Sequence, residues 1–391
     1  MRKNTFENNA PPQNQDLHRE VFVLSTEIMI VNAINLIYSE QNPYTYKICI
    51  LIGRVATEQY FSKLANTGIF EKIYIIDYQE PRPKFWIRNL KTRAIFSPLE
   101  VFLYLIRKNK IPILKKHYFN TNPDLYDELA NCSDFYFHNF NDLTKPLLST
   151  LSKRTRIHLL EEGTASYLKT TIPINNIFAI HLYDPDLAIY KTAETSRKFK
   201  AIPQISTHST KVLSTLRELY PSIAPLEDSH IYFDQPMGTN PNILFQLISP
   251  HYRRQKKEYL TRLNLVKHLL SQNSKIAVRL HPSNLVNDKF NKGLSKLSKV
   301  QKTHGNAPFE LELICSKNTH FEFYSLYSTA ACLWRLMIND DLLLNKEIKV
   351  HLLYPELKNK LPDVADAGIS DLLLSFLEKL ALKYPKNFVL G

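Results

Sequence analysis

Glycine is scarce in this sequence: only 8 of the 391 residues are glycine, against 22 prolines. No glycine-rich tandem repeat, heptad array or solenoid period is present, which excludes fibrous and repeat architectures. The hydrophobic share of 44% and the aromatic share of 11% exclude a disordered chain. Because single hydrophobic cores stop growing at about 250–300 residues, a chain of this length is expected to form two domains.

Cysteine is rarer still, and the four cysteines lie far apart along the chain. They form no CxxC pair and no Cys/His pair with metal-ligand spacing, which excludes a disulfide framework and a common type of zinc site. We therefore expect buried thiols in a reducing compartment, no bound metal and no cofactor.

Long apolar runs are missing as well. No stretch of the sequence reaches the roughly 18 apolar residues of a membrane span. Residues 1–19 are polar and lack the apolar core of a signal peptide, so we expect them to be a flexible lead-in. The sequence predicts a cytoplasmic protein that is at most peripheral on the inner membrane.

The charge is unbalanced: 50 Lys and Arg residues against 37 Asp and Glu residues leave a net charge of +13. Such an excess favours an anionic partner. The run from Arg82 to Arg93 includes Phe85 and Trp86, a mixture that suits peripheral contact with an anionic membrane. No helix-turn-helix, zinc-finger or RNA-binding motif accompanies the charge, so nucleic acid is disfavoured as a partner. For any single basic run, a solvated face is the plainer interpretation.

Strand-like and helix-like runs alternate along the chain, which is typical of parallel βαβ units. The pattern weakens between residues 200 and 236, where prolines accumulate, and then restarts. We therefore predict an α/β protein with two Rossmann-like domains facing a central cleft, residues 20–235 and 236–391. The elements expected inside these domains include a helix at Leu99–Lys108 and strands at Ile243–Ile248 and Phe309–Ile314.

An acidic pair follows one predicted strand, where Arg156–Leu160 runs into Glu161, Glu162 and Gly163. The carboxyl ends of parallel strands are where α/β proteins place their ligands. A carboxylate there can accept a proton from an attacking hydroxyl, and the glycine turns the chain. An ordinary acidic turn that caps the next helix is the alternative interpretation.

Two further motifs end predicted strands. His281 and Pro282 follow Ile276–Leu280, and a histidine there can donate a hydrogen bond or a proton to a phosphate. Ser325 lies at the end of the predicted strand Phe321–Tyr324, and Ser328 and Thr329 open an apolar helix. Hydroxyls and unpaired N–H groups at a helix start suit a phosphate. A structural histidine and a simple helix cap remain the alternatives.

Together these blocks resemble the acidic-pair–glycine, HP and serine motifs of bacterial sialyltransferases. The segment THFEFYSLYSTAACL after RLHP is most similar to the lipooligosaccharide sialyltransferase family, glycosyltransferase family 52. Loose similarity covers most of residues 20–355, but only the three short blocks are specific. The resemblance implies a GT-B fold and CMP-sialic acid as donor. It also implies metal-independent, inverting α-2,3 transfer to a terminal galactose of a surface glycan, in lipooligosaccharide or capsule biosynthesis.

The resemblance also implies roles for individual residues. His281 would contact the donor phosphate and assist departure of CMP. Glu310 or Glu312, in the predicted strand of PFELELI, would meet the ribose or the base. The expected donor-binding set is Gly163, Pro282, Glu310, Glu312, Ser325, Ser328 and Thr329.

The sequence departs from the family at the expected catalytic base. Family members carry an aspartate after the Ser-Pro that ends the strand opening the second domain, whereas Ser249 and Pro250 are followed here by His251. Either His251 acts as the base, which its ordinary pKa of about 6.5 permits, or Glu161 or Glu162 does, or the substrate differs. We expect the two glutamates to share the catalytic site with His251.

Other functions remain open at this stage. A polysialyltransferase or a UDP-sugar hexosyltransferase would use the same scaffold. A non-catalytic basic protein that binds nucleic acid or membranes is a more distant alternative, and its binding would weaken steeply with salt. The sequence also leaves a homodimer open.

Overall fold

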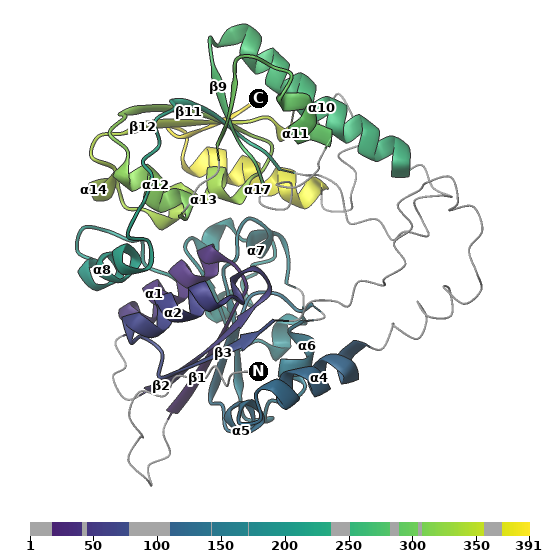
Figure 1. Cartoon of the computed structure of the whole chain (residues 1–391), viewed down its shortest axis with the longest axis vertical. Coiled ribbons are helices and arrows are strands. Elements are labelled where there is room, and N and C mark those ends of the chain that lie inside the picture. Colours follow the sequence, from purple (N-terminus) through teal and green to yellow (C-terminus); the bar gives the residue numbers. More distant parts are fainter. Residues whose placement is uncertain are drawn as a thin grey trace. The chain divides into compact units, whose positions relative to one another are not determined.

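The structure, a computed structural model, divides into two compact units (Figure 1). Unit 1 comprises the chain up to Glu161 together with Thr170–His181, and unit 2 comprises Glu162–Lys169 and Leu182–Gly391. The described residues are 18–40, 45–77, 110–141, 143–170, 172–235, 251–281, 289–303, 307–355 and 370–391.

The first sheet has seven strands, in the order β3-β2-β1-β4-β5-β6-β7. Its strands are β1 (His18–Leu24), β2 (Thr45–Ile52), β3 (Lys72–Ile76), β4 (Asp134–Phe137), β5 (Arg156–Leu160), β6 (Ala179–Leu182) and β7 (Phe199–Ala201). The helices of unit 1 are α1 (Glu27–Glu40), α2 (Glu58–Thr67), α4 (Lys110–Thr121), α5 (Leu125–Ala130) and α6 (Lys145–Leu148).

Local sequence explains these elements. The central strands are buried apolar runs, such as Val21–Leu24 in β1, as expected for parallel strands covered on both faces. Helix α2 begins where the Thr57 side chain accepts the N–H of Tyr60 at 3.3 Å. It ends at Gly68, whose φ of +63° is the left-handed conformation that glycine adopts without strain.

A second, six-stranded sheet has the order β10-β9-β8-β11-β12-β13. Its strands are β8 (His230–Phe233), β9 (Ile276–Arg279), β10 (Val300–Thr303), β11 (His320–Ser325), β12 (Glu347–Leu352) and β13 (Phe388–Leu390). The helices of unit 2 are α7 (Ala165–Leu168), α8 (Thr210–Leu219), α10 (His251–Gln272), α11 (Lys289–Leu294), α12 (Phe309–Cys315), α13 (Thr329–Met337), α14 (Asp340–Leu343) and α17 (Ser370–Lys383).

Both sheets have the doubly wound order in which the first strand lies beside the fourth. The switch points are between β1 and β4 in one sheet and between β8 and β11 in the other, where ligands of open α/β sheets bind. The predicted α/β, GT-B-like fold with two Rossmann-like parallel sheets is confirmed. The expected boundaries at residues 19/20 and 235/236 stay predictions.

One predicted element is wrong. Phe309–Ile314, expected as a strand, lies in α12. Its alternating apolar and acidic residues imitate the period of a strand, but every residue from Phe309 to Leu313 is buried, so the pattern marks no solvent face. Pro308 and the acidic first turn favour a helix start. The strand expected at Ile243–Ile248 and the helix expected at Leu99–Lys108 lie outside the described residues.

In the part of the chain that the structure describes, none of the helices combines the length and the hydrophobicity of a bilayer span. Cytoplasmic location and peripheral membrane contact stay predictions.

A buried ion pair anchors the long helix of unit 2. The Arg262 side chain in α10 donates from Nε and Nη2 to the two carboxylate oxygens of Asp234, at 2.8 and 2.7 Å. Arg262 also stacks over the Phe290 ring at 4.2 Å. Asp234 directly follows β8, so the pair fixes α10 at the carboxyl edge of the sheet.

We expect Arg262→Ala to lower the free energy of unfolding by about 3–5 kcal/mol, because it removes the bidentate guanidinium partner of a buried carboxylate. The control is Lys275→Ala, whose ion pair with Asp228 is largely exposed on the lysine side and should contribute about 0–1 kcal/mol. Urea unfolding of both variants measures the difference. Equal losses in the free energy of unfolding would show that the buried pair of Arg262 and Asp234 stabilises the protein no more than the exposed pair does.

Candidate functional site

Three strands of the second sheet end side by side and carry polar residues at their carboxyl ends. Phe233, Arg279 and Ser325 form one row across β9, β8 and β11. Asp234 follows β8, and its N–H donates to the Arg279 carbonyl at 2.9 Å. The HP motif and the serine motif therefore leave the same edge of one sheet, with β8 between them.

The serine motif forms a tight turn into α13. The Ser325 hydroxyl, fully buried at the end of β11, accepts the N–H of Ser328 at 2.8 Å. Ser328 is the N-cap residue of α13, yet its own hydroxyl makes no cap hydrogen bond to the helix. Ser328 is only 8% exposed. A nearly buried hydroxyl that does not cap its helix is available to a ligand.

The acidic motif ends β5 as expected. Glu161 is buried, and its carbonyl accepts the Asn32 side-chain amide at 2.8 Å. Glu162 is half-buried, and its N–H donates to the Ser166 hydroxyl at 3.0 Å. Of the two carboxylates, Glu162 is the more accessible to a substrate.

The acidic motif and the serine motif touch within unit 2. A methyl group added to Gly163 would lie 2.5 Å from Oγ1 of Thr329 and 2.8 Å from its Cγ2. The N–H of Thr164 donates to the same Oγ1 at 3.4 Å. Two of the three motifs found in the sequence therefore form one contact.

The two glutamates of α12 differ in their partners. Glu312 forms an ion pair with Arg279 of β9, and its other oxygen accepts the N–H of Ala307 at 3.4 Å. Glu310 is also buried. The nucleoside contact expected of Glu310 or Glu312 stays a prediction.

The remaining predicted residues are His281, Pro282 and His251. His281 is half-buried and is the second residue after the end of β9. Pro282 and the Ser249-Pro250 pair lie outside the described residues, and His251 is the first residue of α10, with its side chain also outside them. No catalytic or donor-binding role is tested for these residues.

The first sheet carries a polar pair that sequence reasoning missed. Ser25 follows β1 and His138 follows β4, so they flank the switch point, and Oγ of Ser25 lies 3.3 Å from Nε2 of His138. Burial lowers the pKa of His138 to about 4, which keeps the ring neutral at pH 7. Asp234 was missed in the same way. The signal available in the sequence was the first polar residue after each apolar run.

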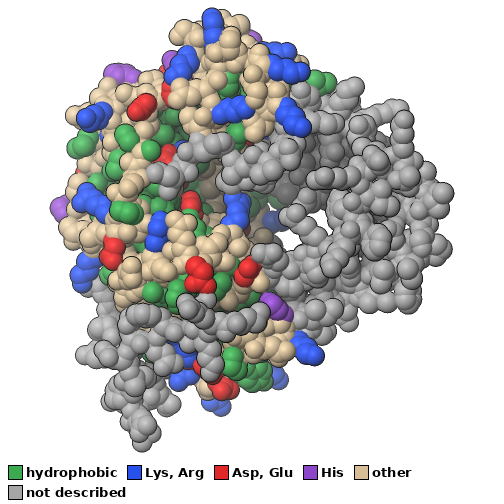
Figure 2. All heavy atoms as spheres, in the orientation of Figure 1, with side chains coloured by type: hydrophobic (Ala, Val, Ile, Leu, Met, Phe, Trp, Pro, Cys, Tyr) green, Lys and Arg blue, Asp and Glu red, His purple; other side chains and the backbone are tan. Residues whose placement is uncertain are grey.

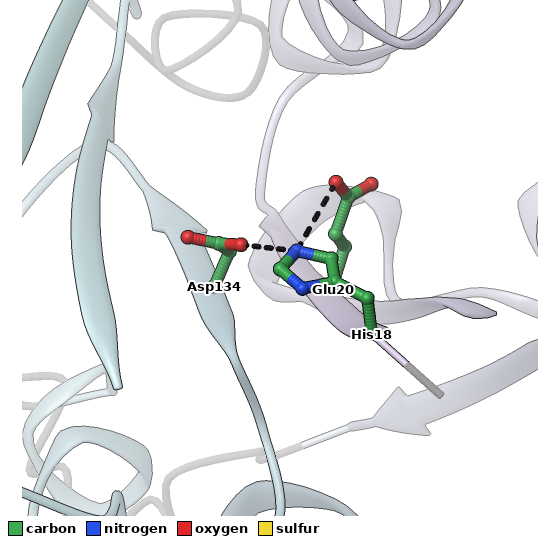
Figure 3. A group of neighbouring side chains, drawn as sticks. All are labelled: His18, Glu20 and Asp134. Atoms are coloured by element: carbon green, nitrogen blue, oxygen red, sulfur yellow. Dashed lines mark ion pairs between the residues drawn. The ribbon is translucent and has the colours of Figure 1, made fainter. Parts of the chain in front are cut away.

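A group of side chains of the types that can bind a metal lies at the amino end of the first sheet (Figure 3). His18 and Glu20 come from β1 and Asp134 from β4, with His18 Nε2 at 2.5 Å from Asp134. Asp134 also accepts two hydrogen bonds from Arg156, both at 2.6 Å, and one from His158 at 2.8 Å. Arg156, His158 and His18 thus fill the acceptor sites of Asp134, so the geometry is explained by hydrogen bonds rather than by a metal.

Basic side chains gather near the top of the face seen in Figure 2, the region where β9 and α10 lie in Figure 1. Among the described residues between 260 and 303, none is Asp or Glu. A basic surface of this kind would suit the anionic partner expected from the sequence. That partner stays a prediction. The exposed lysines of the region are Lys267, Lys275, Lys292, Lys296 and Lys299.

Comparison with known proteins gives fold neighbours only. No protein-family model matches the chain, and no curated protein sequence does. One similar solved structure is UDP-GlcNAc 2-epimerase from Neisseria meningitidis bound to UDP-GlcNAc, with 13% identity, 95% of each chain covered and a TM-score of 0.48. Another is the S. aureus MnaA–UDP co-structure, with 9% identity, 94% of this chain and 96% of that chain covered and a TM-score of 0.45.

A glycosyltransferase is also among the similar structures. It is E. coli ADP-heptose lps heptosyltransferase II, with 10% identity, 94% of this chain and 99% of that chain covered and a TM-score of 0.36.

The expected membership of the lipooligosaccharide sialyltransferase family is therefore wrong. No family model matches, and the similar structures include several UDP-GlcNAc 2-epimerases. The three specific blocks of the resemblance are two to five residues long and lie at strand ends. Doubly wound sheets place turns, caps and polar groups there for local reasons, so such short blocks do not identify a family.

We expect the Asp134 cluster to make stability depend on acid pH. Burial alone raises the pKa of Asp134, but hydrogen bonds from His158 and Arg156 outweigh burial and hold this pKa well below its ordinary value of 3.8. A group with a lowered folded pKa stabilises the protein above the unfolded pKa, and this contribution is lost as the pH falls through the folded pKa.

Urea unfolding from about pH 6 to about pH 3 measures this contribution in the wild type and in Asp134→Asn. The asparagine variant should be less stable at pH 6 and should lose less stability on acidification. Burial raises the pKa of Glu20, an effect of opposite sign that both proteins share. Parallel pH curves for the two proteins would contradict the assignment.

Proposed function

We propose that this chain is a glycosyltransferase that takes a nucleotide-activated sugar, with the donor phosphate bound at the start of α13. The observation that carries the proposal is the Ser328 hydroxyl, nine-tenths buried at the N-cap position but not used as a cap. It lies at the switch point of the second sheet, between β8 and β11.

The start of α13 has the electrostatics that a phosphate needs. The first N–H groups of a helix have no partner within the helix, and the helix dipole adds partial positive charge there. Ser325 holds the Ser328 N–H, which fixes the turn before the ligand arrives. Such a preorganised set of donors stabilises the charge that develops on a departing phosphate.

Transfer requires a base and a leaving group. Glu162 is our candidate base: it would take the proton of the acceptor hydroxyl, whose oxygen attacks the anomeric carbon. The bond from that carbon to the donor phosphate then breaks, and the electron pair leaves with the phosphate bound at α13. His281 would donate a hydrogen bond to the departing phosphate, and general-base assistance contributes about 10²–10⁴-fold in rate.

Such a donor would need no metal-binding side chains, because the helix start and the hydroxyls would carry the phosphate charge. Glu310 or Glu312, both buried in α12, would contact the nucleoside. The acceptor is proposed to be a sugar hydroxyl of a surface glycan, reached at an anionic membrane.

The first experiment measures nucleotide release and sugar transfer with a panel of sugars activated by UDP, GDP, ADP and CMP, with and without glycan acceptors. Release that depends on acceptor, with a new glycosidic product, supports the proposal. Turnover that changes the donor sugar without transferring it, or no binding of any nucleotide, would overturn it.

Ser328→Ala tests the phosphate site. Since a hydrogen bond to a charged group contributes about 1.5–3 kcal/mol, donor affinity should fall by roughly 10–100-fold. Ser209→Ala is the matched control: Ser209 is the N-cap residue of α8 in the same unit, and its hydroxyl accepts the Ser206 N–H. Calorimetric titration with the nucleotide measures both. Unchanged affinity in Ser328→Ala would place the phosphate elsewhere.

A further inference from the structure

We infer that Thr329 is a positioning residue, which sets the candidate base Glu162 at a fixed distance from the start of α13. The inference rests on the proposed function for its catalytic meaning. It rests on the contact of Thr329 with Gly163 and Thr164 for its geometry. Thr329 was expected from the sequence as a phosphate ligand, and the structure shows its side chain against the acidic loop.

The contact is too close for any side chain at position 163. A Cβ there would meet Oγ1 of Thr329 at 2.5 Å, Cγ2 at 2.8 Å and Cβ at 3.2 Å. Real Cβ atoms do not approach heavy atoms to 2.5 Å, so the loop can lie this near α13 only with glycine. Rotating the threonine to make room would move Oγ1 away from the Thr164 N–H.

The loop is also held from its other side. The Glu162 N–H donates to the Ser166 hydroxyl, and the Ser166 carbonyl accepts the Tyr190 hydroxyl at 2.9 Å. In α7, Tyr167 packs on Phe376 of α17, with ring centroids 5.2 Å apart. With α7 anchored in this way, Thr329 is the contact that fixes the approach of residues 162–164 to the first turn of α13.

Such a contact acts on the chemical step rather than on donor affinity. The donor phosphate would bind the Ser328 hydroxyl and the helix start whether or not residues 162–164 keep their position beside α13. The base, however, must reach the acceptor hydroxyl in line with the bond that breaks. A misplacement of about 1 Å can cost roughly 100-fold in rate.

Two substitutions of Thr329 separate its hydroxyl from its shape. Thr329→Ser keeps the acceptor for the Thr164 N–H, whereas Thr329→Val keeps the volume and removes the acceptor. We expect kcat to stay within about threefold of wild type in the serine variant and to fall about tenfold in the valine variant. The donor KM and the nucleotide Kd should be unchanged in both. A rise in donor KM with kcat unchanged would make Thr329 a phosphate ligand and overturn the inference.

A compensating pair tests the steric part. Gly163→Ala should lower kcat about 100-fold, and adding Thr329→Ala, which removes both clashing γ atoms, should restore kcat at least tenfold. Gly68→Ala is the control, because this glycine has a positive φ but open space around its Cβ position, so its variant loses stability alone. Losses in kcat that simply multiply in the double variant would overturn the inference.

Urea unfolding of the wild type, Gly163→Ala, Thr329→Ala and the double variant distinguishes this inference from the proposed function. Coupling between Gly163 and Thr329 in stability, together with coupling in kcat, supports both. Coupling in stability with kcat unaffected means that the contact is structural only and overturns the positioning role. A wild type that turns over no activated sugar overturns the proposed function and the positioning role with it, while the stability coupling still measures the contact.

Discussion

Parallel pairing is the constraint on which the rest of this structure depends. The described ladders of both sheets are parallel, so the carboxyl ends of neighbouring strands share one edge. Each chain segment leaving that edge must turn, and small or polar residues make the turns. The edge of the second sheet thereby collects Asp234, His281 and Ser325 without any of them being close in sequence. The chemistry of the molecule follows from this geometry.

Much of the fold was predictable because buried parallel strands read as apolar runs. The strand ending at Leu160 and the helix opening after Ser328 are examples, and both appear as expected. The strand prediction for Phe309–Ile314 failed because Phe309 to Leu313 are all buried in the helix, so the alternation of apolar and acidic residues marks no solvent face. Period alone cannot distinguish such a helix from a strand.

The site was predictable only as a set of positions. The sequence places Gly163 and Thr329 at two chain turns, but their contact across 166 positions depends on how α7 and α13 pack. The pairing of Asp234 with Arg262 likewise depends on the path of α10. The family assignment failed for the same reason: short motifs report local turns, whereas a binding site is formed by side chains that only packing brings together.

The membership of Glu162–Lys169 in unit 2 has a consequence for how the chain is made. This segment emerges early in synthesis, yet its partners Thr329 and Phe376 are encoded far downstream. Asp184 also has a partner that is synthesised much later, because its carboxylate accepts a hydrogen bond from the Tyr384 hydroxyl at 2.8 Å. Contacts of such long range form late and slow the folding of a domain. A nascent chain can therefore complete much of its first sheet while the loop that carries Glu162 still lacks the surface against which it packs.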